Sequence, residues 1–241
     1  MQNYDLDNFE PAAKIVVIGV GGAGNNAVNR MIDEEISNVD FYVANTDKQA
    51  LASSKANNRI ILGEALTGGL GAGGEPEMGE QAAEASADDI REIVKDANMV
   101  FVAAGMGGGT GTGATPVIAE RAQSMGIMTF VIAVEPFSFE TARIAAAKEG
   151  IAKIRQVCPN TIVVSNDLMI QRMPDLTMRA ALDAVNASIA SFIERKIALI
   201  KECFESEFEA ISAELLEESL SSGTTADLVD SIRIHPKTAK E

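Results

Sequence analysis

The stretch of this sequence best suited to binding chemistry is residues 107–113, which place five glycines within seven residues. Glycine lets backbone N–H groups approach an anion closely, and the hydroxyls of Thr110 and Thr112 add two further donors. The apolar run 99–104 before it is typical of a buried strand, and a helix is expected after it with Pro116 in the first turn. Because a helix N-terminus also attracts anions, the segment predicts a site for a diphosphate or triphosphate. A flexible glycine linker is the alternative, but linkers do not usually separate a buried strand from a helix.

A second glycine-rich turn follows the first predicted strand, residues 14–20. Gly19, Gly21 and Gly24 form a G-x-G-x-x-G pattern that runs into a predicted helix at residues 25–32. This pattern is typical of a dinucleotide-binding unit, in which the glycines let the backbone approach the pyrophosphate. Taken alone, it would predict an NAD-linked oxidoreductase.

Asp47 fits the same hypothesis, since it follows a predicted strand at residues 41–44 and could bind a ribose hydroxyl. Two observations weigh against NAD. The richer glycine loop at residues 107–113 is redundant for a dinucleotide. Asn25 and Asn26 also place amide side chains where the loop at residues 19–24 would meet phosphate. A P-loop NTPase is excluded because the chain contains no Gly-Lys-Ser or Gly-Lys-Thr.

Composition limits the classes of protein further. The chain has 241 residues, 46% of them hydrophobic, which is enough for one large α/β domain with an appendage. Its formal net charge of −15 argues against nucleic-acid binding, so an anionic ligand must be held by local amides and dipoles. Cys158 and Cys203 have no metal or redox spacing, no metal site is predicted, and both fit a reducing cytosol. No signal peptide or membrane span is recognised, so we expect a cytoplasmic protein.

The remaining pattern predicts the elements that must position these loops. Buried strands and helices alternate, with strands at residues 14–20, 41–44, 59–62, 99–104, 129–134 and 161–165, and helices at residues 25–32, 81–97, from 117 and 144–157. Such alternation predicts a three-layer α/β fold with a mostly parallel sheet, and ligands of such folds bind at the carboxyl ends of the strands.

Domain limits follow from the same pattern. We expect an N-terminal arm at residues 1–12 and the nucleotide-binding α/β domain at residues 13–175. Apolar residues then recur every three or four positions, which predicts one long amphipathic helix at residues 176–222, before a tail at residues 223–241.

Residues 107–113, Gly-Gly-Gly-Thr-Gly-Thr-Gly, resemble the signature loop of the FtsZ/tubulin family of GTPases. Residues 19–31 resemble the first nucleotide loop of FtsZ, and residues 45–51 resemble its second. The resemblance extends densely over about residues 12–200. It implies the family's Rossmann-like GTPase fold, in which the long helix is the central helix.

The resemblance also implies a set of nucleotide contacts in this sequence. They are Gly21, Gly22, Ala23, Gly24, Asn25, Asn26, Asn45, Asp47, Ala72, Gly73, Gly74, Gly105, Gly107, Gly108, Gly109, Thr110, Gly111, Thr112, Pro136, Glu140, Arg143, Asn166 and Asn186. Pro136 and Glu140 would bind the ribose with help from Arg143. An Asn after a strand can offer its amide to a guanine edge, and the family reads the base at the positions of Asn166 and Asn186.

Several positions depart from the usual FtsZ pattern, among them Glu135, which replaces the basic residue before Pro136. The glycine-rich loop 66–79 resembles the loop that senses the γ-phosphate, but Gly68 replaces a basic residue and Glu75 replaces Asn. Arg143 lies three residues after the ribose-binding Glu, where four are usual. Asn186 stands where FtsZ usually has Asp and tubulins have Asn. Guanine recognition is therefore expected to persist, with a weaker grip on the γ-phosphate.

The implied function is that of a GTP-binding cytoskeletal protein of cell division that binds GTP or GDP, optionally with Mg²⁺. In FtsZ an acidic loop of the form Asn-x-Asp-x-x-Asp and a second domain follow the central helix, and the loop completes hydrolysis in the neighbouring subunit. Neither is recognised here, so we expect weak or partner-dependent hydrolysis and no catalytic residue is assigned. The predicted partner is a second copy or a full-length FtsZ paralogue. A different class remains open, namely a non-hydrolysing regulator or cap of filaments of that paralogue.

One substitution and two candidate carboxylates follow from the sequence. Gly109→Val is expected to obstruct the phosphates and leave the protein folded, because no core packing is predicted there. Glu207 and Glu209 in the predicted helix are candidates to replace the lost acidic loop.

Overall fold

The computed structural model describes residues 14–173 and 175–205 of the chain. In these residues six strands form a single sheet in the order β3-β2-β1-β4-β5-β6, and every neighbouring pair is parallel. The strands are β1 Ile15–Val20, β2 Asp40–Asn45, β3 Asn58–Ile61, β4 Met99–Gly105, β5 Met128–Glu135 and β6 Thr161–Ser165. The helices are α1 Gly21–Asp33, α2 Lys48–Ala52, α3 Glu64–Thr67, α4 Pro76–Ala85, α5 Ala87–Val94, α6 Gly109–Ser124, α7 Thr141–Val157, α8 Asn166–Arg172 and α9 Met178–Glu205.

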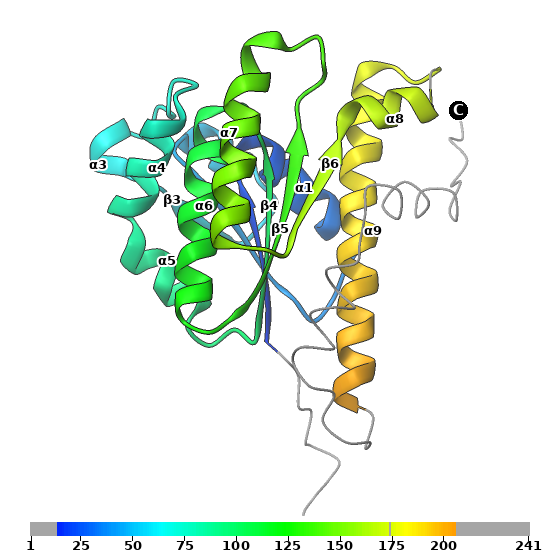
Figure 1. Ribbon diagram of the computed structural model, residues 1–241. Helices are drawn as coiled ribbons and strands as arrows, with labels where there is room; N and C mark the ends of the chain where they lie inside the picture. The colour runs from blue at the N-terminus through cyan, green and yellow to red at the C-terminus, as the bar shows by residue number, and fades with distance from the viewer. Residues whose placement is uncertain (1–13, 174, 206–241) are drawn as a thin grey trace, which may run out of the picture.

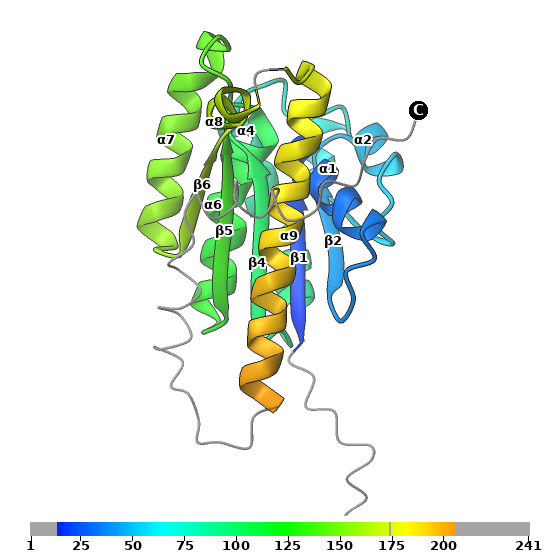
Figure 2. The same ribbon diagram turned by 90° about the vertical axis from the view of Figure 1, so that its right-hand side faces the viewer.

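The helices cover both faces of the sheet, so the predicted three-layer α/β fold with a parallel sheet and a long C-terminal helix is confirmed. In Figure 1, α4, α5, α6 and α7 lie on one face, and α9 runs along the other. Figure 2 shows α9 crossing in front of the central strands, beside α1. A parallel sheet buried on both faces needs strands without polar residues, and all six residues of β1 are buried.

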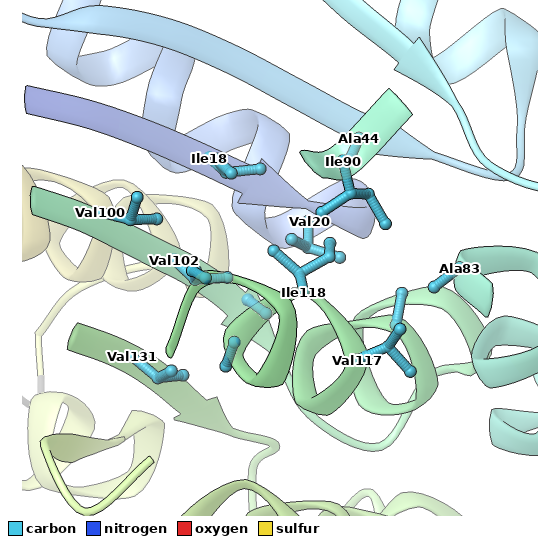
Figure 3. Packing of buried hydrophobic residues seen from close by; sticks show 14 of the residues in the cluster. Ile18, Val20, Ala44, Ala83, Ile90, Val100, Val102, Val117, Ile118 and Val131 are labelled. Atoms are coloured by element: carbon cyan, nitrogen blue, oxygen red, sulfur yellow. The ribbon is translucent and has the colours of Figure 1, made fainter. Parts of the chain in front are cut away.

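Two apolar cores result, one on each face. The core under α4 to α7 joins Val100 and Val102 of β4 to Val117 and Ile118 of α6, as Figure 3 shows. The core under α1 and α9 includes Phe101 and Phe130, whose rings stack 5.5 Å apart in adjacent strands. Alternate residues of one strand thus serve opposite cores, as the two-residue period of a strand requires.

The order of the strands places a crevice between β1 and β4. From β1 the chain proceeds to β2 on one side and later returns to β4 on the other. Such a switch point in a parallel sheet leaves a crevice at the carboxyl ends of the strands. α1 follows β1 directly and α6 follows β4 after a short turn, and the N-termini of the two helices meet at this crevice.

The start of α6 differs from the prediction. The helix begins at Gly109 and not near Pro116, which lies inside it. Five of the seven residues of the predicted glycine loop, 109–113, are therefore helix. The physical reason is close packing against α4: a Cβ at Gly113 would overlap the Pro76 carbonyl oxygen, and one at Gly79 would overlap the Gly109 carbonyl oxygen. The glycines thus serve helix contact as well as ligand approach.

Other predicted boundaries are also wrong. The single helix expected at residues 81–97 is two helices, α4 and α5, separated at Ser86, whose hydroxyl accepts a hydrogen bond from the Gly63 N–H at 3.0 Å. The first helix begins at Gly21 and not at Asn25. The long helix is described from Met178 to Glu205. Its predicted continuation to residue 222, the arm at residues 1–12, the tail at residues 223–241, and Glu207 and Glu209 lie outside the described residues.

Candidate nucleotide-binding site

A cavity of about 570 Å³ opens at the carboxyl ends of the central strands. Its size suits a ligand as large as a nucleotide. Fifteen of the residues predicted from the sequence line it, namely Gly21, Gly22, Ala23, Gly24, Asn26, Gly105, Gly108, Gly109, Thr110, Gly111, Pro136, Glu140, Arg143, Asn166 and Asn186. These residues come from five separate segments that only the fold brings together.

One end of the cavity is formed by the N-termini of α1 and α6. A Cβ at Gly21 would lie 3.0 Å from the Gly111 nitrogen, so the two helix starts are nearly in contact. A Cβ at Gly22 or Gly108, in contrast, would meet no atom within 4 Å. These two glycines therefore face open space in the cavity, where a ligand atom can approach the backbone. Two converging helix N-termini with bare backbone form a site for phosphate groups.

The hydroxyl of Thr110 at this end is already engaged with the protein. Its Oγ1 lies 2.7 Å from Oγ1 of Thr46, which is fully buried between β2 and α2. The carbonyl oxygen of Thr46 accepts a hydrogen bond from the Gly71 N–H at 3.1 Å. Thr46 therefore connects the first turn of α6 to the glycine-rich loop before α4.

The opposite end of the cavity combines an apolar wall with amides. Asn166, at the start of α8, is 6% exposed, and its Oδ1 has no hydrogen-bond partner in the described part of the chain. Asn186 on α9 lines the same cavity. Burial of an unpaired amide oxygen is costly, which suggests that a ligand N–H group completes it.

The apolar wall was missed by the sequence analysis. It is made by Phe139, Met178, Leu182, Val185 and Ile189, among others. The apolar period of residues 176–222 predicted a long amphipathic helix but no contribution to a cavity wall. The apolar residues of this helix are evident in the sequence, but their periodicity does not reveal that the first turns of α9 extend along a cavity.

Charged side chains contribute little positive charge to the cavity. Arg143 is the only cation among its lining residues, and its Nη1 lies 2.8 Å from Oε2 of Glu140. The other oxygen of Glu140 accepts a hydrogen bond from the Phe137 N–H at 3.1 Å. The shifted spacing of Arg143 therefore still places it at the cavity, paired with the predicted ribose ligand. A bound anion would be held mainly by backbone amides and helix dipoles, as the net charge had indicated.

Eight predicted residues do not line the cavity, and their contacts with a ligand remain predictions. They are Asn25, Asn45, Asp47, Ala72, Gly73, Gly74, Gly107 and Thr112.

Several of these residues support the local backbone. Asp47 accepts hydrogen bonds from the Gln49 and Ala50 N–H groups at 2.8 and 3.2 Å and so caps α2, and Asn45 accepts from the Asp47 N–H at 3.3 Å. Thr112 accepts from the Gly107 N–H at 2.7 Å. The amide nitrogen of Asn25, in the orientation that satisfies its neighbours, donates to the Gly21 carbonyl oxygen at 2.8 Å.

Gly109 lines the cavity and also packs against the loop before α4. A Cβ there would lie 2.8 Å from Cβ of Ala72 and 2.9 Å from the Glu75 nitrogen. Valine at this position would therefore displace the loop before α4, and the expectation that it obstructs only the ligand is wrong. Gly108 is the position of the signature segment at which a side chain would enter the cavity alone.

The described residues contain neither a cluster of metal-binding side chains nor a helix that could span a membrane. Within residues 14–173 and 175–205, no group of three or more His, Cys, Asp or Glu side chains could hold a metal ion. Over the same residues, no helix is both long and apolar enough to cross a membrane.

The comparison with protein families decides the identity of the fold. The family described as "Tubulin/FtsZ family, GTPase domain" matches residues 14–174. The chain belongs to this family. Membership removes the NAD-linked oxidoreductase from consideration, although the strand order is also that of the dinucleotide-binding fold.

Relatives support the same assignment. The chain is 50% identical over 176 residues to the cell division protein FtsZ of Mycoplasmopsis pulmonis, covering 73% of this chain and 45% of the relative. It is 42% identical over 191 residues to FtsZ of Aquifex aeolicus, covering 78% and 52% respectively. The chain thus spans about half the length of the curated relatives that it matches.

Solved structures agree with these relatives. An empty FtsZ dimer from M. jannaschii is similar with a TM-score of 0.79 and 33% identity, over 90% of this chain and 62% of that one. CetZ2 from Haloferax volcanii, at 24% identity, shares the fold with a TM-score of 0.73, over 88% and 64% of the two chains.

Proposed function

We propose that this chain binds GTP and GDP in the cavity at the carboxyl ends of β1 and β4, as a cytoskeletal protein of cell division. One observation carries the proposal: two bare helix N-termini form one end of a cavity whose other end holds the buried, unpaired amide oxygen of Asn166. The first end suits phosphates and the second suits a base that donates hydrogen bonds.

The residues present fit this ligand. Gly22 and Gly108 leave space where backbone N–H groups can meet phosphate oxygens. Guanine presents an N–H and an NH₂ on one edge, so it can satisfy Oδ1 of Asn166, with Asn186 as a second amide. Adenine has an acceptor nitrogen at the corresponding ring position and would leave the oxygen unpaired. A Mg²⁺ ion would be held mostly by phosphate oxygens and water, as is usual for this metal, so a protein cage for it is not needed.

Competition binding tests the nucleotide assignment. A fluorescent GDP analogue bound to the full chain should be displaced by GTP and GDP well ahead of ATP and NAD. Each unpaired buried polar group costs about 1–3 kcal/mol, so ATP should bind roughly 5- to 150-fold more weakly for each group left unpaired. Equal affinities for GTP and ATP would contradict the guanine assignment.

We further propose that hydrolysis is completed in trans by a neighbouring subunit. The activating pattern Asn-x-Asp-x-x-Asp does not occur in the printed sequence. The similar M. jannaschii protein was solved as a dimer, which supports self-association of this chain. Phosphate release should therefore stay low at every concentration of the chain alone and rise when a complete FtsZ is added.

The same sequence observation favours a second candidate, a GTP-binding regulator or cap of filaments of a full-length FtsZ paralogue. It differs from the first in one measurable respect. A cap should slow or shorten assembly of the paralogue without phosphate release in its own site. Mixing the chain with an FtsZ whose nucleotide site is disabled separates the two, because only trans hydrolysis then releases phosphate.

A further inference from the structure

Asp167 joins two segments of the cavity wall that are 29 residues apart in sequence. It is the second residue of α8, directly after Asn166. Its Oδ1 and Oδ2 each lie 3.1 Å from the Ser138 nitrogen, and Oδ1 lies 3.3 Å from Oγ of Ser138. One carboxylate thus accepts from both the main chain and the side chain of the loop between β5 and α7. Hydrogen bonds to an ionised acceptor are the stronger kind.

The loop that Asp167 holds carries the aromatic part of the cavity. Ser138 lies between Phe137 and Phe139, whose rings stack with centroids 5.1 Å apart and an interplanar angle of 9°. Both rings line the cavity. Phe137 is buried, whereas Phe139 is 60% exposed at the rim.

Other hydrogen bonds in this loop are internal to it. The Phe137 N–H donates to Glu140 Oε1, and the Glu140 N–H donates to the Phe137 carbonyl oxygen at 2.9 Å. They fix the shape of the loop but not its distance from α8. Among the described residues, the bonds from Ser138 to Asp167 are the hydrogen bonds that connect this loop to α8.

We propose that Asp167 is a positioning residue for the base end of the nucleotide site. It sets the separation between the Phe137–Phe139 wall and the amide of Asn166, so that a purine placed against the rings presents its edge to that amide. The inference rests on the proposed function, since it needs a nucleotide in this cavity. Asp167 is not assigned a contact with the base itself.

The test compares variants of the full chain in binding a fluorescent GDP analogue. Asp167→Ala should weaken GDP binding at least about tenfold, because it removes a charge-assisted acceptor of the loop. Asp167→Asn keeps one acceptor oxygen and should recover part of the loss. Ser138→Ala keeps the main-chain donor and should lose about two- to threefold. Asp89→Ala, which removes an exposed carboxylate of α5, controls for the change in net charge and should bind as the parent does.

Two further readouts separate positioning from general destabilisation. Pyrophosphate, which can occupy only the phosphate end, should displace the analogue from Asp167→Ala at the same intrinsic affinity as from the parent. Adding Ser138→Ala to Asp167→Ala should cause no further loss, because both remove the same connection. If Asp167→Ala is too unstable to study, Asp167→Asn and Ser138→Ala carry the test through the same pyrophosphate comparison.

The outcomes are distinguishable from failure of the proposed function. If the parent binds no guanine nucleotide, the proposed function fails and this inference fails with it. If the parent binds GDP and Asp167→Ala binds it equally well, only the positioning role is refuted. Equal losses for GDP and pyrophosphate, or fully additive effects of the two substitutions, would also refute it.

Discussion

Substitution of Gly108 by alanine is the sharpest test of how phosphates would be held. Gly108 has φ −98° and ψ 176°, an extended conformation that alanine adopts freely. Its added Cβ would meet no protein atom within 4 Å. The variant should therefore fold with unchanged stability, yet its methyl group would occupy the space in which a phosphate meets the N-terminus of α6.

The expected magnitude follows from the contact that is lost. A phosphate forced away from the backbone loses at least one hydrogen bond to a charged acceptor, worth about 1.5–3 kcal/mol. This corresponds to roughly 10- to 150-fold weaker GDP binding. Calorimetric titration of GDP would measure the affinity, and thermal unfolding without nucleotide would measure the stability.

Two matched variants complete the experiment. Gly22→Ala also adds a Cβ that meets no atom within 4 Å, but within a helix. It should weaken GDP binding while raising stability by up to about 0.5–1 kcal/mol, the helix preference of alanine over glycine. Gly126 has φ +74° after the end of α6, outside the cavity lining. Gly126→Ala should lower stability by about 1 kcal/mol and leave the affinity unchanged. If Gly108→Ala and Gly22→Ala both bind GDP as the parent does, the phosphates are not held by these helix N-termini.

Three further predictions concern the surroundings of the cavity. Gly109→Val should lower the free energy of unfolding by about 1–3 kcal/mol, because its side chain overlaps the loop at Ala72 and Glu75; an unchanged denaturant midpoint would contradict this. Asn166→Ala should weaken GDP binding roughly tenfold or more without a comparable loss of stability, since its Oδ1 is unpaired before ligand binds; calorimetry and thermal unfolding together check both parts. A hydrogen bond to Glu80, with the charge of that residue, raises the pKa of Lys153, so the pair stabilises the fold at neutral pH and loses this effect as the pH rises through that raised pKa. Because both side chains are nearly half exposed, Lys153→Met should lower stability by less than about 1 kcal/mol at pH 7, measured by urea unfolding, and by nothing in strong alkali.

The layout of the fold could be predicted from local patterns. Each strand that forms the sheet reads as a short apolar run, and each glycine turn lies where a strand passes into a helix. Strand order could not be predicted from those runs, and it would not have decided the function. The order found is shared with dinucleotide-binding enzymes. The glycine loop 107–113, the amides of Asn25 and Asn26 and the family resemblance weighed against those enzymes, and the family match over residues 14–174 decided the identity.

The segment 107–113 was misjudged because its glycines also make close contacts with residues distant in sequence. Gly113 has to be glycine because α4 packs too closely against it for any side chain, and this contact is with Pro76, 37 residues earlier. Asp47 has the type and place of a ribose ligand, and its contact with a ligand stays a prediction, while its carboxylate also caps the helix that follows. A sequence motif shows which residues can bind a ligand. It does not show which of them are already engaged by the protein.

The glycines of residues 107–113 have consequences for how this sequence can diverge. Gly108 faces the cavity, Gly109 the loop before α4, Gly111 the carbonyl oxygen of Gly105 in β4, and Gly113 the helix α4. Of these four glycines, only Gly108 is therefore under selection for nucleotide binding without being required by protein packing as well. In a descendant lineage that no longer needs the nucleotide, Gly108 and Gly22 are free to drift, whereas Gly111 and Gly113 stay fixed by folding. Most of the glycine signature would then be retained because of packing alone. The residue at position 108 would therefore indicate more reliably than the signature as a whole whether the protein still binds the nucleotide.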